Sequence, residues 1–285
     1  MMNKILNGKL IAGYVKDAVK QDVELLKHRG MHPALAVIQV GNHAASDVYV
    51  RNKQKACEYV GIKSYVYRES EDISEQELIQ RIQELNMSLN IHGILVQLPL
   101  PEHMNERHVL DAISPDKDVD GFHPMNAGRL FLKEGVLLPC TAAGILEILL
   151  QYHISIDGKR CVVVGRSNIV GNPVAQLLQK ENGTVTVVHS HTDNMREITS
   201  QADILVVAAG KKGLIGAEDV KDGAVVIDVG IHRDDKNHLS GDVDFDAVYD
   251  KVSYITPVPG GVGPMTVAML MKNCVLAAKM QCDCN

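Results

Sequence analysis

The fold of this chain depends on the stretch Arg-Cys-Val-Val-Val-Gly-Arg-Ser-Asn-Ile-Val-Gly-Asn-Pro, which runs from Arg160 to Pro173. Cys161 to Val164 is a short apolar run rich in β-branched side chains, which predicts a buried parallel strand. Gly165 ends this run, and a helix is expected over Val174 to Glu181. The stretch therefore predicts a strand, a tight glycine turn and a helix in direct succession.

The turn between this strand and this helix is a potential anion site. Pro173 suits the first turn of the helix, where a missing N–H costs nothing, and Asn172 is predicted as the N-cap. Free backbone N–H groups and the helix dipole would then point at the turn. The glycine pattern, Gly165-x-Ser167-x-x-x-Gly171, differs from the common G-x-G-x-x-G fingerprint. By itself it fits a phosphate site and an ordinary strand–helix turn equally well.

The residues after the next strand indicate which nucleotide the turn would bind. A second strand is expected over Thr184 to Val188, about 20 residues after the turn, where dinucleotide folds place the group that reads the adenine ribose. The chain has His189-Ser190-His191 there and no carboxylate before Asp193. Arg166, in the turn itself, can pair with a phosphate. This arrangement favours NADP over NAD, and a solvated arginine without a ligand is the alternative.

Length and composition are those of an ordinary globular chain. Its 285 residues suit two domains, and 46% of them are hydrophobic and 22% charged. The formal net charge of −6 gives no electrostatic support to a nucleic-acid role. No run approaches the roughly 18 apolar residues of a membrane span, and the N-terminus lacks the apolar region of a signal peptide. We therefore expect a cytoplasmic protein that binds neither nucleic acid nor membranes.

The six cysteines form no recognisable disulfide or metal pattern. Three lie in apolar patterns and are expected in the core: Cys57, Cys161 and Cys274. Cys282 and Cys284 form a C-x-C pair without a second pair, whereas a structural zinc site needs four ligands. The twelve histidines show no H-E-x-x-H spacing. We expect no bound metal.

Strand-like and helix-like segments alternate along the chain, which predicts an α/β fold with largely parallel sheets. In the first half the expected strands are Ala34–Val40, Ser64–Arg68 and Ile94–Leu98. The expected helices are Lys9–His28, one capped by Ser46 and ending at Val60, one capped by Ser74 with Glu77 in a capping box, and Asn105–Ile113.

The second half has the pattern of a Rossmann-like dinucleotide-binding domain. A helix over Thr141–His153 leads into it, and its further expected elements are the strands Ile204–Ala208, Val225–Val229 and Tyr254–Thr256 and a last helix, Pro264–Lys279. We predict two α/β domains with a cleft between them. One comprises residues 1–139 plus 265–285, and the other comprises residues 140–264.

The helix over residues 46–60 carries a lysine on its apolar face. At about 100° per residue, one stripe of this helix contains Tyr49, Ala56, Cys57 and Val60. Lys53 falls in the middle of that stripe. A lysine on a buried stripe is partly desolvated, which makes its amine a usable base. A lysine that extends past the rim into water is the alternative.

Three further stretches place polar or flexible residues where ligands bind. Gln97 lies near the carboxyl end of its strand, where open α/β sheets bind ligands. A hydrogen-bonded core glutamine is the alternative. Asp118-Val119-Asp120-Gly121 is an acidic turn that suits the surface or a metal, although no third ligand is evident. Pro257–Pro264 is too apolar for a plain surface loop and suits close approach of the backbone to a flat ligand.

Five motifs follow one another along the chain. They are Val-Gly…Ala-Ser-x-x-Tyr-Val-x-x-Lys-x-Lys-Ala-Cys (40–57), Gly-Ile-Leu-Val-Gln-Leu-Pro-Leu-Pro (93–101), Asp-Lys-Asp-Val-Asp-Gly-Phe-His-Pro (116–124), Gly-Arg-Ser-x-Ile-Val-Gly-x-Pro (165–173) and Thr-Pro-Val-Pro-Gly-Gly-Val-Gly-Pro-Met-Thr (256–266). In this order, and over nearly the whole chain, they resemble the methylenetetrahydrofolate dehydrogenase/methenyltetrahydrofolate cyclohydrolase family.

The resemblance implies an NADP-dependent enzyme of one-carbon metabolism and purine biosynthesis. It would oxidise 5,10-methylenetetrahydrofolate to 5,10-methenyltetrahydrofolate and hydrolyse the product to 10-formyltetrahydrofolate. Residues 1–139 plus 265–285 would be a folate-binding catalytic domain, and residues 140–264 would bind NADP. The resemblance also implies a homodimer.

The resemblance further implies which residues form the site. The catalytic residues would be Lys53, Tyr49, Gln97 and Asp120, with Tyr49 against the folate ring, Gln97 bonded to the lysine and Asp120 holding the pterin. The cofactor would contact Gly165, Arg166, Ser167, Ser190 and Ile231. Besides the four catalytic residues, the folate would contact Val96, Leu98, Pro259, Gly260, Gly261, Val262 and Gly263.

Two positions depart from the family pattern. Ala142 stands where relatives often have proline, and Lys212 stands where they often have the proline of Gly-Lys-Pro-Gly. The second loop is expected on the cofactor side, so cofactor affinity is the property that this substitution would change.

Three alternative functions remain open. They are a monofunctional NAD-dependent dehydrogenase of the same family, a folate-binding protein without catalysis, and an amino-acid or shikimate-type dehydrogenase.

Overall fold

The computed structural model has an α/β fold with parallel sheets, as the alternating pattern predicts. It describes residues 4–42, 44–134 and 137–283. The chain divides into two compact units. The first unit comprises Gly13–Cys140 and Val267–Asn285, and the second unit comprises Met1–Ala12 and Thr141–Thr266.

The first twelve residues fall in the second unit, whereas the sequence places them in the first domain. The reason is an edge contact with the sheet of the second unit. Ile5 forms a parallel bridge with Ile255, and the backbone N–H of Ile255 donates to the carbonyl of Lys4 at 2.9 Å. The ligand assigned to each domain stays a prediction.

The first unit is built on a three-stranded parallel sheet in the order β2-β1-β3. Its strands are β1 (Ala34–Val40), β2 (Lys63–Glu69) and β3 (Gly93–Val96). Its helices are α2 (Ala44–Val60), α3 (Glu75–Met87), α4 (Glu106–Asp111) and α5 (Pro124–Phe131). Every residue of β1, the central strand, is buried.

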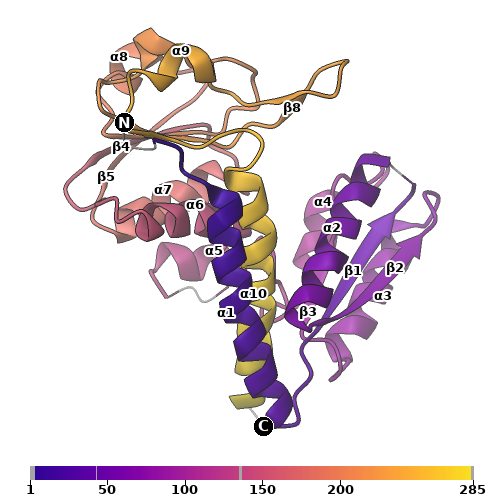
Figure 1. The fold of residues 1–285 in the computed structure, drawn as a ribbon. Coiled ribbons are helices and arrows are strands. Elements are labelled where there is room, and N and C mark those ends of the chain that lie inside the picture. Colours follow the sequence, from indigo (N-terminus) through magenta and orange to yellow (C-terminus); the bar gives the residue numbers. More distant parts are fainter. Residues whose placement is uncertain (1–3, 43, 135–136, 284–285) are drawn as a thin grey trace. The chain divides into compact units, whose positions relative to one another are not determined.

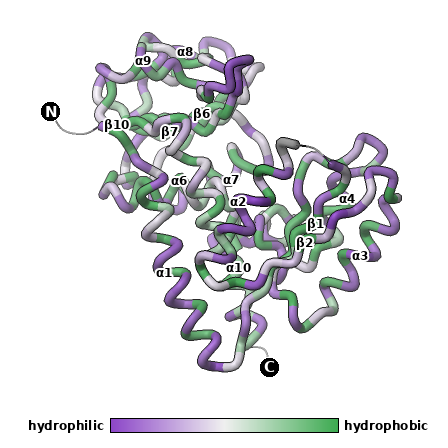
Figure 2. The backbone as a smooth tube through the Cα atoms, turned by 45° about the vertical axis from the view of Figure 1, so that its right-hand side comes forward, coloured by the Kyte–Doolittle hydropathy of each residue, from purple (hydrophilic) through white to green (hydrophobic). Residues whose placement is uncertain are grey.

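Two long helices, α1 (Gly8–His28) and α10 (Val262–Asp283), lie side by side (Figure 1). Lys279 of α10 donates a hydrogen bond to Asp22 of α1 at 2.9 Å. Hydrophilic and hydrophobic stretches alternate along α1 (Figure 2), as expected for a helix with one buried face. The buried positions recur every three or four residues: Ile11, Val15, Val19, Val23 and Leu26.

The second unit is built on a five-stranded parallel sheet in the order β10-β7-β6-β4-β5. Its strands are β4 (Arg160–Val164), β5 (Thr184–Val188), β6 (Ile204–Val207), β7 (Val225–Asp228) and β10 (Tyr254–Ile255), with a separate antiparallel pair, β8 (His232–Arg233) and β9 (Leu239–Ser240). Its helices are α6 (Cys140–Gln151), α7 (Gly171–Lys180), α8 (Met195–Thr199), the 3-10 turn η1 (Ala217–Asp219) and α9 (Phe245–Tyr249).

The predicted helix starts are partly confirmed. Ser74 caps α3, and Glu77 completes the predicted capping box. The prediction for Ser46 is wrong, because α2 begins at Ala44 and Ser46 lies inside the helix. Pro264 is the third residue of α10, where its missing N–H still leaves no intrahelical bond unmade.

Candidate active site

Lys53 and Gln97 come from different elements of the first unit and meet there. Lys53 Nζ donates a hydrogen bond to Gln97 Oε1 at 3.0 Å. Gln97 directly follows β3, which ends at Val96 rather than at the expected Leu98. Gln97 Nε2 donates to the carbonyl of Leu98 at 2.7 Å, and this second bond fixes the orientation of the amide. The polar residue at the carboxyl end of β3 therefore holds the amine of α2.

The lysine lies in the middle of the buried stripe of α2, as predicted, but Tyr49 is not buried. Val50, Cys57 and Val60 are fully buried, and Lys53 is partly buried among them. Tyr49 is 48% exposed. At about 100° per residue, Tyr49 lies on this stripe between Ala56 and Val60, so the helical period predicts its burial and only the tertiary packing leaves it exposed. Its phenol ring is thus available to a ligand on this side of α2.

The two carboxylates of the acidic turn have different environments. Asp118 is buried and accepts bonds from the backbone N–H groups of Gly121, Phe122 and His123 and from Asn126 Nδ2, at 2.8 to 3.2 Å. Within the described part of the chain, Asp120 has no hydrogen-bond partner. Asp118 therefore holds the turn together, and Asp120 is left for a ligand.

Burial raises the pKa of Asp120 to about 6, and the nearby charge of Lys53 only partly offsets this effect. The carboxylate of Asp118 adds to the increase. A carboxylate without a protein donor in such a place costs stability. A ligand that donates hydrogen bonds would supply what the protein does not.

Asn273 supports this turn and was not found from the sequence. Its side-chain nitrogen donates to the carbonyls of Val119 and Leu138, both at 2.8 Å. The thiol of Cys140 donates to the same carbonyl of Val119 at 3.2 Å. Asn273 is 2% exposed, and an asparagine inside the apolar run of α10 was the available signal. These bonds fix the backbone directly before Asp120 and the backbone at Leu138, against which Gly121 packs.

In the second unit, the glycine turn of the opening motif links β4 to α7. A Cβ atom at Gly171 would overlap the carbonyl of Gly165, so the turn is closed as tightly as the backbone allows. The N-cap prediction for Asn172 is wrong, because α7 begins one residue earlier. Instead, Ser167 Oγ accepts from the N–H groups of Val170 and Gly171 at 3.2 and 3.3 Å. The hydroxyl of Ser167 takes up the first free donors of this helix.

Arg166 and Ser190 follow the carboxyl ends of two paired strands. The N–H of Gly165 donates to the carbonyl of Val188 at 2.8 Å, which brings the two segments together. Arg166 and Ser190 are both exposed. Partial burial, and then the charge of Arg166, lower the pKa of His189. The residues predicted to bind the phosphate therefore lie together at the carboxyl end of the sheet.

Ile231 and the glycine-proline stretch line one pocket of about 120 Å³ in the second unit. The pocket includes Pro259, Gly260, Gly261, Val262 and Gly263. Ile231 is 50% exposed. Gly260 has a φ of +105°, which favours glycine. Val262 and Gly263 already belong to α10.

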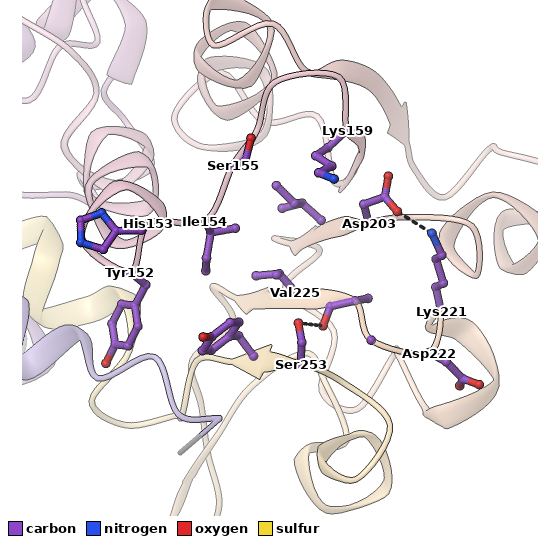
Figure 3. Close-up of a pocket in the computed structure, with 14 residues that line it drawn as sticks. Tyr152, His153, Ile154, Ser155, Lys159, Asp203, Lys221, Asp222, Val225 and Ser253 are labelled. Carbon is purple, nitrogen blue, oxygen red and sulfur yellow. Dashed lines mark hydrogen bonds and ion pairs between the residues drawn. The ribbon is translucent and has the colours of Figure 1, made fainter. Parts of the chain in front are cut away.

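A second pocket, of about 300 Å³, lies where the strands of this sheet begin, at their amino ends (Figure 3). Ile204, Val225 and Tyr254 line it, and each is the first residue of its strand. Lys221 in this pocket is already paired with Asp203. Parallel sheets bind ligands at the carboxyl ends of their strands, so this pocket is not the cofactor site.

The remaining predictions concern metals, membranes and the departures from the family pattern. Among the described residues no group of three His, Cys, Asp or Glu could hold a metal ion. None of the described helices has the length and apolar character of a membrane span. Ala142 is buried in the first turn of α6, and Lys212 is exposed. Cys282 is a free, exposed thiol, and Cys284 lies outside the described residues.

Two family models cover most of the chain. The catalytic domain of tetrahydrofolate dehydrogenase/cyclohydrolase matches residues 6–120, and its NAD(P)-binding domain matches residues 139–282. This chain belongs to the tetrahydrofolate dehydrogenase/cyclohydrolase family.

Family members with established names are similar along their whole length. The bifunctional protein FolD of Agathobacter rectalis is 58% identical, over 98% of this chain and 100% of that protein. The crystal structure of the FolD methylenetetrahydrofolate dehydrogenase/cyclohydrolase from Campylobacter jejuni has a TM-score of 0.95 at 48% identity, covering 97% of this chain and 98% of that one. The Trypanosoma brucei FolD, solved with NADP cofactor and an inhibitor, has a TM-score of 0.92 at 40% identity, covering 97% of each chain.

Proposed function

We propose that this protein oxidises 5,10-methylenetetrahydrofolate to 5,10-methenyltetrahydrofolate with NADP, and then hydrolyses that product to 10-formyltetrahydrofolate. Membership of the family and the full-length similarity to FolD proteins support both activities. The observation that carries the proposal is the Lys53–Gln97 hydrogen bond near Asp120, which has no hydrogen-bond partner among the residues that the structure describes. These residues combine an amine, an amide that orients this amine, and a carboxylate that can bind the substrate.

The first reaction needs geometry more than acid–base chemistry. A hydride leaves the methylene carbon between N5 and N10 of the folate, and the lone pairs of these nitrogens stabilise the cation. When bound, NADP accepts this hydride through its nicotinamide ring. The residues of the protein therefore have to hold the folate still and in line. Asp120 does this by accepting hydrogen bonds from the donor groups of the pterin, and Tyr49 lies against its ring.

The second reaction needs a base. Water adds to the methenyl carbon and loses a proton, and the bond from that carbon to N5 then breaks as N5 gains a proton, which leaves the formyl group on N10. Lys53 is the residue that accepts the proton of the water. Gln97 directs the lysine amine without adding a charge.

NADP is the cofactor, and the second unit holds it. Gly165 and Ser167 shape the turn that receives the phosphates, Arg166 and Ser190 contact the 2′-phosphate, and Ile231 contacts the nicotinamide end. Supporting this, no carboxylate occupies the ribose-reading position after β5. The alternative, a monofunctional enzyme that uses NAD, gives Arg166 no partner.

The remaining contacts and the biological setting are extensions of this proposal. Val96 and Leu98 flank Gln97 and complete the folate site of the first unit. The assignment of Pro259 to Gly263 to the folate stays a prediction, since these residues belong to the second unit. By family resemblance we also propose a cytoplasmic homodimer that supplies 10-formyltetrahydrofolate for purine biosynthesis.

A single absorbance assay tests the proposal. Purified protein is mixed with 5,10-methylenetetrahydrofolate and either NADP or NAD, and methenyltetrahydrofolate is followed as it forms and decays. We expect formation with NADP, weaker formation with NAD, and decay faster than in buffer. Formation without accelerated decay would indicate a monofunctional dehydrogenase, and folate binding without formation would indicate a protein that only binds folate.

A further inference from the structure

A fully buried carboxylate, Asp242, connects two turns at the carboxyl edge of the sheet in the second unit. Its Oδ2 accepts hydrogen bonds from the backbone N–H groups of Ala209 and Gly210, at 2.7 and 2.8 Å. Its Oδ1 lies 2.7 Å from Nε2 of His232. Since a carboxylate oxygen accepts in this arrangement, the imidazole is the donor. One side chain therefore ties the turn after β6 to the segment after β7.

The turn after β6 packs directly against the glycine turn after β4. The N–H of Ala208 donates to the carbonyl of Val164 at 2.8 Å. A Cβ atom at Gly165 would overlap the carbonyl of Ala208, so the two backbones are in contact. A displacement of Ala209 and its neighbours would thus be felt in the phosphate-binding turn.

The segment after β7 is held in the same way. Asp228 accepts from the N–H groups of Gly230, Asp242 and Val243 at 2.9 to 3.0 Å. Ile231, which precedes His232, lines the 120 Å³ pocket. Both carboxylates are buried, with Asp242 0% exposed and Asp228 4%. Buried carboxylates side by side cost stability, which indicates that they serve the geometry of these turns.

We propose that the His232–Asp242 pair is a positioning element for the nicotinamide cofactor. It holds Ala209 and Gly210 against the phosphate-binding turn and Ile231 at the nicotinamide end. Neither side chain touches the cofactor in this role. The inference rests on the proposed function, because it assumes that NADP binds at this edge.

The first test measures NADP affinity by calorimetry in the full-length protein. Asp242→Asn replaces one of the two acceptor oxygens by a donor, so the side chain can no longer accept from both the backbone N–H groups and the imidazole N–H, and the Kd should rise about 10- to 100-fold. The ratio of dehydrogenase to cyclohydrolase activity should fall about 10-fold at low NADP, because only the first reaction uses the cofactor. Asp234→Asn is the matched control. Asp234 also accepts from two backbone N–H groups and pairs with a histidine, but on an exposed hairpin turn, and its Kd should stay within about twofold of the wild type.

A second pair of variants separates positioning from folding. His232→Gln keeps a donor in the place of Nε2 and should bind NADP nearly as the wild type does, whereas His232→Leu removes the donor and should weaken binding about fivefold. Wild-type affinity in Asp242→Asn, or equal losses in both His232 variants, would overturn the inference and leave the proposed function standing. A wild-type protein that binds neither NADP nor NAD would overturn both.

Discussion

The amine of Lys53 donates a hydrogen bond of 3.0 Å to the amide oxygen of Gln97, a residue 44 positions further along the chain. The glutamine is itself fixed by its bond to the carbonyl of Leu98. No carboxylate forms an ion pair with Lys53 in the described part of the chain. The lysine is therefore oriented by a neutral partner, which leaves its amine free to exchange a proton with substrate water.

Replacing this lysine should separate the two reactions. Lys53→Met keeps the packing of the side chain and removes the base, and a general base typically contributes 10²–10⁴-fold in rate. Cyclohydrolase activity should fall by about that factor, while dehydrogenase activity falls less, so methenyltetrahydrofolate should accumulate in the coupled assay. Lys55→Met, at an exposed position of the same helix, is the control. A folded Lys53→Met protein with wild-type cyclohydrolase activity would contradict the proposed base.

The ionised carboxylate of Asp120 should lower the free energy of unfolding while it serves substrate binding. Burial raises its pKa to about 6, so ionisation of the folded protein costs free energy that the unfolded chain does not lose. Below about pH 4 both states are protonated and the cost is absent, and it grows until the pH passes about 6. At about pH 8, Asp120→Asn should raise the free energy of unfolding by about 1–3 kcal/mol. Both enzymatic activities should fall by about 10-fold or more, because the substrate loses its acceptor.

Denaturant unfolding at several pH values checks this prediction. The gain in stability of Asp120→Asn should shrink as the pH falls and disappear near about pH 4. Asp116→Asn, an exposed position before the same turn, is the control and should change neither stability nor folate affinity. Unchanged folate affinity in Asp120→Asn would place Asp120 outside the substrate site.

The support of the Asp120 turn can be tested from α10. Asn273→Leu has a similar volume but leaves the carbonyl of Leu138 without this donor and weakens the hold on Val119, which should cost about 1–3 kcal/mol of unfolding free energy. The folded fraction should also show a raised KM for the folate. Asn52→Leu, on the exposed side of α2, is the control. Loss of stability at an unchanged KM would show that Asn273 has no influence on Asp120.

Cofactor preference should depend on Arg166. A hydrogen bond between charged groups contributes about 1.5–3 kcal/mol, so Arg166→Ala should weaken the use of NADP roughly 10- to 150-fold and change the use of NAD little. Steady-state kinetics with each cofactor measure the difference. Arg29→Ala, at an exposed arginine of the first unit, should alter neither. Equal losses with NADP and NAD would remove the phosphate-reading role.

Chelation should leave both activities unchanged, because the described residues contain no cluster of metal ligands. The protein is dialysed against a chelator and assayed with and without added divalent ions. Activity that is lost on dialysis and restored by an ion would show that a metal takes part.

The sequence by itself determined the family and the order of the main strands and long helices, but not the short elements α5, α8, α9, β8 and β9. Parallel strands buried on both faces, such as β1 and β4, appear as unbroken apolar runs, so they can be found without a structure. The capping box at Ser74 also depends only on neighbours in the chain. Local rules failed where more than one residue can satisfy the same donors, and Ser167 rather than Asn172 accepts from the start of α7.

Only the tertiary structure decided which polar side chains form hydrogen bonds within the protein and which remain available to a ligand. The sequence presents Asp118 and Asp120 as equivalent, but the folded turn uses all the acceptor capacity of Asp118 and leaves Asp120 without a hydrogen-bond partner among the described residues. Likewise, the roles of Asn273 and Asp242 arise from bonds to backbone groups far away in the chain. Periodicity reports which face of an element is buried, whereas hydrogen bonds between distant segments exist only once the chain has folded.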